Sequence, residues 1–293
     1  MENMRGAALI VAAMAVFAIE DMFIKKLSMS GVPLGQILCL LGFGGGTIFA
    51  IVAQSRGERV LSPLFFERAV VFRNLGEIIG TLGFVVAITL TPISSASAIF
   101  QANPLAVTLG AALFLNETVG WRRWSAIVVG FLGVLLIVRP GTEHFDPKSL
   151  FAVLAVFGLA LRDLATRVIP KTVTSFQLSA WGFSTLIPAG LLLFLVTGAA
   201  PRAMSQHEGL LMGAALLCGL IGYYLIVGAM RIGEVSFVTS FRYSRLVFAL
   251  IVGMVFFGES PDELTLAGSA LIVGSGLYAL LRERRQKRRA QIA

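Results

Sequence analysis

Charged and amide side chains occur inside stretches of this chain that are otherwise apolar enough to cross a lipid bilayer. Arg73, Asn74 and Glu77 lie within about one helical turn, and the spacing of Arg73 and Glu77 predicts an ion pair along one helix face. A charge near mid-bilayer costs roughly 2.5 to 3.5 kcal/mol on insertion scales, so these groups should face protein or water. Glu77 falls close to the centre of its stretch, which makes it the first candidate for binding a solute or a coupled proton.

Two further polar clusters occupy later apolar stretches. Gln101 and Asn103 precede Pro104, which predicts a kinked helix with polar backbone facing a cavity. Arg242 and Arg245 share a helical face, and Arg245 lies about 14 Å into the hydrocarbon by helical rise. Two arginines there could hold a carboxylate or another anionic group of a solute.

Two interpretations of these clusters stay open at this point. They form a binding site for a solute, or Glu77, Arg73, Arg242 and Arg245 form a buried ion network that only fixes helix packing. Tyr223, on a later stretch, either lines the same cavity or is packed with its hydroxyl bonded.

A second group of charges lies nearer the ends of the predicted spans. It comprises Glu20, Asp21, Lys25 and Lys26 in the first span and Arg162, Asp163 and Arg167 in the sixth. Their mirrored depth suits an outer and an inner gate that close by exchanging ion pairs. It suits equally well two sets of solvated helix ends.

The elements that must position these residues are membrane-spanning helices. The chain is 57% hydrophobic, above the roughly 45 to 50% of soluble domains, and its mean hydropathy is +0.86. Runs of about 20 apolar residues predict an all-α integral membrane protein with ten spans. Their approximate ranges are 6–27, 33–53, 69–88, 93–115, 121–139, 148–168, 175–197, 208–230, 236–257 and 264–281.

An internal repeat relates the two halves at one constant offset of 142 residues. It superposes Asp21 on Asp163, Lys25 on Arg167, Gly80 on Gly222, Ala87 on Ala229, Ser94 on Ser236, Phe114 on Phe256 and Glu117 on Glu259. We predict a first five-helix repeat over 1–141, a second over 148–281 and a basic tail over 282–293. An odd number of spans in each copy makes the copies inverted relative to each other, a design found in many secondary transporters.

Basic residues near the span ends predict cytoplasmic N and C termini. The outer segments hold only Lys25, Lys26, Arg139, Lys148 and Arg202, whereas the inner ones hold most of the other basic residues. The net charge of +8 owes much to the tail, which follows a span and is expected to contact anionic lipid head groups rather than nucleic acid.

No metal or cofactor is predicted. Cys39 and Cys218 lie inside predicted spans without metal-ligand or CxxC spacing, and His144 and His207 fall in predicted outer loops. A membrane-embedded enzyme would need a cluster such as HExxH or an Asp-rich metal site, so this class is disfavoured. A passive channel is disfavoured by mid-membrane charges of mixed sign.

Several motifs resemble the EamA-type repeat of the drug/metabolite transporter (DMT) superfamily. They are Leu90–Ala98, Asn103–Leu105, Phe114–Glu117 and Gly130–Gly141, with similar stretches at Ile232–Ser236, Phe256–Glu259 and Gly268–Gly276 in the second copy. The resemblance implies ten helices in two five-helix units with both termini inside, and it marks Glu117 and Glu259 as the family's acidic position, which we interpret as structural. The second copy departs from the first, with Arg245-Leu246 in place of Asn103-Pro104, as a solute without two-fold symmetry would require.

The resemblance implies a mechanism class rather than a substrate. Members of the superfamily export amino acids and other metabolites or take up solutes such as riboflavin, S-adenosylmethionine or sugar phosphates. We therefore expect a secondary transporter in a bacterial inner membrane that moves a small polar organic metabolite by alternating access. Export of an amino acid or related metabolite is the leading case, and uptake of a vitamin or cofactor-like solute is the second. The sequence leaves substrate, direction, coupling to protons and oligomeric state open.

Overall fold

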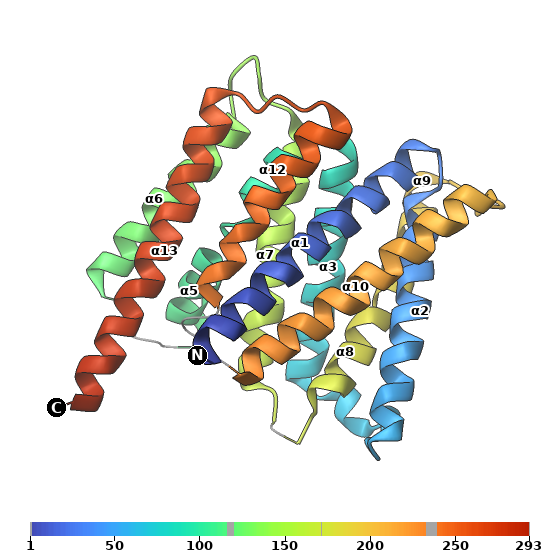
Figure 1. The fold of residues 1–293 in the computed structure, drawn as a ribbon, viewed down its shortest axis with the longest axis horizontal. Coiled ribbons are helices and arrows are strands. Elements are labelled where there is room, and N and C mark those ends of the chain that lie inside the picture. The colour runs from blue at the N-terminus through green and yellow to red at the C-terminus, as the bar shows by residue number, and fades with distance from the viewer. Residues whose placement is uncertain (1, 116–119, 171, 233–238, 293) are drawn as a thin grey trace.

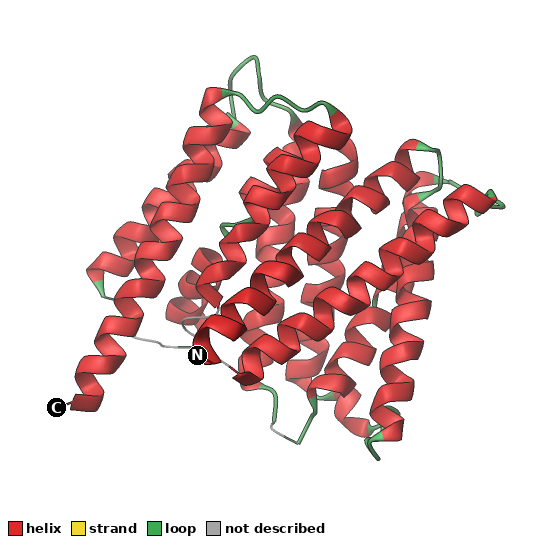
Figure 2. Ribbon diagram, viewed as in Figure 1, coloured by secondary structure: helices red, strands yellow, loops and turns green. Residues whose placement is uncertain are grey.

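The protein is built from helices, as Figure 2 shows for a computed structural model that describes residues 2–115, 120–170, 172–232 and 239–292. No strand occurs in those ranges. Seven helical segments in the described chain are long and apolar enough to span a membrane, and Trp124–Val138 and Glu263–Ala279 are shorter apolar helices. The described chain therefore has the architecture of a multi-pass membrane protein.

The first half contains six α-helices and one 3-10 turn among its described residues. They are α1 (Glu2–Met29), α2 (Leu34–Ser55), η1 (Pro63–Phe66), α3 (Arg68–Leu90), α4 (Ile93–Phe100), α5 (Asn103–Phe114) and α6 (Trp121–Val138). Gly31 has φ +87° between α1 and α2, a conformation that favours glycine and lets the chain reverse over a few residues.

The second half contains a similar series of elements, with two helices rather than one at the place of α2. It contains η2 (Pro147–Ser149), α7 (Leu150–Val168), α8 (Ser175–Ser184), α9 (Leu186–Thr197), α10 (Gln206–Ile232), η3 (Thr239–Tyr243), α12 (Ser244–Phe257) and α13 (Glu263–Ile292). The described residues of each of the ten predicted ranges overlap one helix or two consecutive helical segments, and residues 236–238 of the ninth range lie outside the described residues. That all ten cross a bilayer stays a prediction.

Helix packing follows the sequence repeat. The helix α1 packs along α10, and α3 packs along α7. The offset that relates the halves converts the first of these pairs into the second. Glycines allow close approach, since a Cβ atom built on Gly158 of α7 would lie 2.4 Å from the backbone nitrogen of Gly80 on α3.

Sequence-equivalent helices run in opposite directions. Figure 1 shows α1 rising from the end of the bundle where the N-terminus lies, whereas α7 descends toward that end. The helices α3 and α10 are opposed in the same way, and the C-terminus lies at the same end of the bundle as the N-terminus.

Within the described ranges, three helical stretches are interrupted. The helix α4 stops at Phe100 and α5 starts at Asn103, directly before Pro104, so the predicted kink is confirmed. The turn η3 precedes α12 at the equivalent place in the second half. The break between α8 and α9 at Thr185 was not expected, although Pro188 lies one turn beyond it.

The apolar core of the described residues consists of one large cluster and two smaller ones. The large cluster includes Leu27, Val32, Ile88 and Ile93 at the end of the bundle away from the termini, and it extends to Ala106 and Val107 of α5. The two smaller clusters lie toward the termini, one around Ile10, Met14 and Ala229 and the other around Val70, Val173 and Trp181.

Candidate functional site

A cavity of about 480 Å³ lies among the helices of both halves. Its volume is within the range of roughly 300 to 1,000 Å³ that is typical of small-molecule sites. Ten of the residues singled out from the sequence line it: Asp21, Arg73, Glu77, Gln101, Asn103, Arg162, Asp163, Tyr223, Arg242 and Arg245. The residues assigned to the binding site and those assigned to gates therefore share one cavity.

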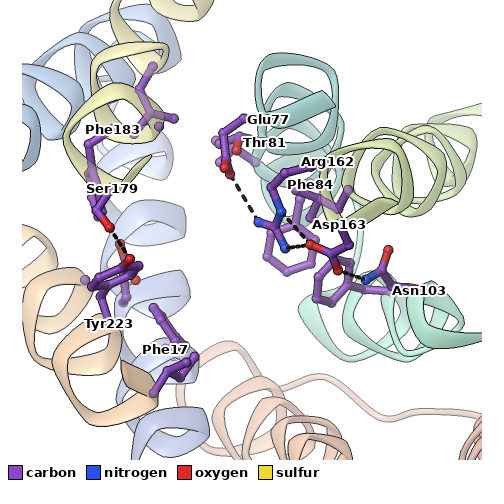
Figure 3. A pocket seen from close by; sticks show the side chains of 18 of the residues that line it. Phe17, Glu77, Thr81, Phe84, Asn103, Arg162, Asp163, Ser179, Phe183 and Tyr223 are labelled. Atoms are coloured by element: carbon purple, nitrogen blue, oxygen red, sulfur yellow. Dashed lines mark hydrogen bonds and ion pairs between the residues drawn. The ribbon is translucent and has the colours of Figure 1, made fainter. Parts of the chain in front are cut away.

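One wall of the cavity carries a chain of charged contacts. Glu77 pairs with Arg73 at 3.1 Å and with Arg162 of α7 at 3.2 Å. Arg162 also pairs with Asp163 at 2.7 Å, and Asn103 donates a hydrogen bond to Asp163 at 3.1 Å. Figure 3 shows this chain from Glu77 to Asn103 on α3, α7 and α5. The predicted pair of Arg73 and Glu77 is confirmed.

A second, separate ion pair joins α1 to α12. Arg245 binds Asp21 at 2.7 Å, and their side chains are only 15% and 6% exposed. The guanidinium of Arg245 also lies 5.5, 4.9 and 5.3 Å from the ring centroids of Phe17, Phe84 and Phe100. Aromatic faces attract cations, so these rings help to hold Arg245 in the cavity wall.

The two halves place different chemistry at equivalent positions. The offset converts the pair of Asp21 and Arg245 into the pair of Asp163 and Asn103, and both pairs exist in the structure. At this repeat position the first half has the amide of Asn103 and the second half has the guanidinium of Arg245. Each of them contacts the aspartate of the other half, and these two aspartates are themselves equivalent in the repeat.

Tyr223 lines the opposite wall of the cavity. Its hydroxyl is hydrogen-bonded to Ser179 of α8, and Figure 3 shows the two side chains facing the wall that carries Glu77 and Arg162. The ring also packs against Phe49 at 4.7 Å between centroids. Tyr223 is therefore both packed and exposed to the cavity.

Four predicted residues, namely Asn74, Lys25, Lys26 and Arg167, do not line the cavity. Asn74 is buried and accepts a hydrogen bond from Arg73 at 3.0 Å, so it orients that arginine. Lys25 donates to the backbone oxygen of Thr91 at 2.9 Å and to Glu259 at 3.0 Å.

Glu259 has the structural position that the sequence suggested. Its carboxylate accepts hydrogen bonds from the backbone nitrogens of Ile93 and Ser94 at 2.7 and 3.0 Å. A carboxylate at these free amides stabilises the first turn of α4. Glu117 lies outside the described residues.

Sequence reasoning assigned Glu20 to a span end, but its side chain lines the cavity together with Phe17, Phe84 and Phe100. The repeat held a signal for Glu20, because its equivalent is Arg162, which was already a candidate. The phenylalanines gave no comparable signal because the chain has 22 of them.

Outside the spans, Arg139 binds Asp262 between the end of α6 and the start of α13. This hydrogen bond from the guanidinium holds the pKa of the Asp262 carboxyl well below its usual range. Across the described residues, no group of three or more His, Cys, Asp or Glu side chains is placed to hold a metal ion.

Known transporters are similar to this chain in sequence. The S-adenosylmethionine uptake transporter of Rickettsia felis is 26% identical over 73% of this chain and 72% of its own length. The riboflavin transporter of Rhizobium johnstonii is 30% identical over 72% of this chain and 69% of its own length. The pseudopaline exporter CntI of Pseudomonas aeruginosa is 27% identical over 92% of this chain and 93% of its own length.

The fold also matches a solved crystal structure with a TM-score of 0.56 and 19% sequence identity, over 96% of this chain and 98% of the other. The model of the EamA-like transporter family matches residues 4–139 and 147–281, which is nearly the whole chain. The protein therefore belongs to the EamA-like transporter family, within the drug/metabolite transporter superfamily.

Proposed function

We propose that this protein is a secondary transporter that carries a small polar organic metabolite across a bacterial inner membrane by alternating access. The observation that carries the proposal is the cavity wall, where four carboxylates and four guanidinium groups meet inside a bundle of apolar helices. They are Glu20, Asp21, Glu77, Asp163, Arg73, Arg162, Arg242 and Arg245. So many charges within apolar helices are costly, and a path for a polar solute gives them a use.

The proposal includes ten membrane-spanning helices in two inverted repeats, 1–141 and 148–281. The opposite directions of α1 and α7, and of α3 and α10, support this arrangement. The basic residues near the inner span ends support cytoplasmic termini. In this orientation the basic tail 282–293 meets anionic lipid head groups.

The divided core supports an inward-facing state. The cavity wall includes Ser175 at the start of α8 and Met14 on α1, both toward the termini. At that end the apolar clusters of α1 with α10 and of α3 with α8 are separate from each other, whereas the residues that pack the far end belong to one large cluster. Movement between the two states would close one end and divide the other.

The relatives narrow the class of solute only in part. Two of them are named for uptake of S-adenosylmethionine and transport of riboflavin, and one is named as a pseudopaline exporter. We retain export of an amino acid or a related metabolite beside uptake of a cofactor-like solute, because alternating access runs in the direction that the gradients set.

Counterflow in proteoliposomes tests the function. The full chain is reconstituted, loaded in turn with amino acids, S-adenosylmethionine and riboflavin, and assayed with and without an imposed pH gradient. We expect exchange of at least one of these solutes above protein-free liposomes, and its loss in Glu77→Gln. If no solute exchanges, the proposed function is wrong.

A matched control keeps the result specific. Glu67→Gln removes a carboxylate that is exposed at the start of α3 and does not line the cavity, so this variant should exchange solute at the wild-type rate. If Glu77→Gln transports as well as this control, Glu77 has no role in binding or coupling.

A further inference from the structure

We infer that the transported solute is a zwitterion, whose cationic group binds Glu20 and whose anionic group binds Arg242. This inference rests on the proposed transport function. Most charged side chains of the cavity wall already pair with a side chain of opposite charge, whereas, within the described chain, Glu20 and Arg242 do not.

Six of the eight charged groups pair within the wall. Glu77 binds Arg73 and Arg162, Asp163 binds Arg162, and Asp21 binds Arg245. Glu20 and Arg242 also line the cavity, but neither side chain forms a hydrogen bond or ion pair with another described residue. One carboxylate and one guanidinium group of the wall are therefore available to bind the solute.

The repeat explains why Glu20 lacks a partner. Glu20 is equivalent to Arg162, and Gly219 is equivalent to Glu77. Arg162 has its counterion in Glu77, whereas Glu20 lies against a residue without a side chain. A Cβ atom built on Gly219 would lie 2.7 Å from Glu20 Oε1, so the glycine makes room for the carboxylate and supplies no cation.

Arg242 is unpaired for a related reason. Asp163 is the carboxylate that acts on it electrostatically, and Asp163 is already bound by Arg162 and Asn103. The backbone oxygen of Arg242 accepts a hydrogen bond from Gln101 at 3.3 Å, which fixes the backbone and leaves the guanidinium free. A free guanidinium presents a planar fork of donors that matches a carboxylate.

The two free groups line one cavity of about 480 Å³, which is the size of a small-molecule site. Arg242 lies three residues before Arg245, and Glu20 directly precedes Asp21, the partner of Arg245, so both are next to the same ion pair in the sequence. A neutral solute would leave both charges without a partner when it fills the cavity, and a solute with a single charge would leave one. A zwitterion satisfies both at once.

The test measures binding of methionine and S-adenosylmethionine to the purified full chain in detergent by equilibrium dialysis. Two probes lack the carboxylate, namely methionine methyl ester and decarboxylated S-adenosylmethionine, and the α-hydroxy acid analogue of methionine lacks the ammonium group. Riboflavin serves as the uncharged probe. We expect at least one zwitterion to bind more tightly than its own analogues and than riboflavin.

The variants assign each charge of the solute to a residue. Glu20→Gln should weaken zwitterion binding about tenfold to a hundredfold, as expected for loss of a charge-assisted hydrogen bond, and leave the hydroxy acid unchanged. Arg242→Gln should weaken the zwitterion to a similar extent and leave the probes without a carboxylate unchanged. Binding of the unaffected probe shows that each variant is folded.

Glu67→Gln and Arg68→Gln, an exposed pair at the start of α3, are the matched controls and should bind as the wild type does. The inference is overturned if either cavity variant binds the zwitterion with wild-type affinity, or if riboflavin or the probes that lack one of the two groups bind and exchange in proteoliposomes while methionine and S-adenosylmethionine do not. In the latter case the proposed transport function stands. If no probe binds or exchanges, the transport function and the inference fall together.

Discussion

Replacing Arg245 by Gln leaves the Asp21 carboxylate buried without its cation. Asp21 is 4% exposed, and the two side chains meet at 2.7 Å. Removing one member of such a pair costs about 3 to 5 kcal/mol, because an uncompensated charge stays in the interior. Asp21→Asn should cost a similar amount, since it leaves the guanidinium of Arg245 unpaired.

The double variant Asp21→Asn/Arg245→Gln should lose far less than the sum of the two single variants. Two neutral amides can hydrogen-bond to each other and leave no buried charge, so we expect a coupling free energy of about 3 kcal/mol. This coupling corresponds to a factor of more than about 100 in the folding equilibrium constant. It would be measured from the free energy of unfolding in a reversible denaturant titration in mixed micelles.

The pair of Arg139 and Asp262 is the matched control for the cycle. The Asp262 side chain is 50% exposed, so screening by water should limit its coupling to about 1 kcal/mol or less. If the two cycles give equal coupling, or if the changes in unfolding free energy of Asp21→Asn and Arg245→Gln simply add, burial does not decide the strength of the Asp21 pair.

Three other variants test the scaffold. Glu259→Ala removes the carboxylate that serves Lys25 and the first turn of α4, so we expect a loss of about 3 kcal/mol of unfolding free energy and a lower thermal midpoint. An unchanged midpoint would rule out this structural role. Gly158→Ala forces a Cβ into the backbone of α3 and should also lower the midpoint, whereas Gly213→Ala, which meets open space, should not. Because a hydrogen bond from Arg139 holds the pKa of Asp262 below its usual value, that carboxylate stabilises the fold above about pH 4. Its contribution is lost as the pH falls further, so the difference in midpoint between wild type and Asp262→Asn should shrink below about pH 4, and a difference that grows there would contradict the assignment.

Local features of this fold could be predicted from the sequence. The positions of the helices follow from the length of the apolar runs, the pair of Arg73 and Glu77 follows from a spacing of four, and the break before Asn103 follows from Pro104. Each of these depends on residues that are neighbours along the chain.

Contacts between distant helices could not be predicted in the same way. Depth along a span, counted from the sequence, placed Asp21 and Asp163 near opposite span ends, whereas the structure places both in one cavity. Counting residues gives a distance along a helix axis but neither the tilt of the helix nor the neighbour that its polar face meets. The pair of Asp21 and Arg245 spans 224 residues of chain, and only the packed bundle brings the two together.

The equivalent packing of α1 on α10 and of α7 on α3 has an energetic consequence for the transport cycle proposed above. If the halves exchange their conformations during the cycle, contacts that are the same in both halves contribute equally to the inward and outward states and cancel from the free-energy difference between them. Only positions where the copies differ, such as Gly219 against Glu77, can set which state the empty protein prefers. A difference of about 1.4 kcal/mol at such a position changes the ratio of the two states tenfold, so single substitutions there would shift the resting orientation without disturbing the scaffold.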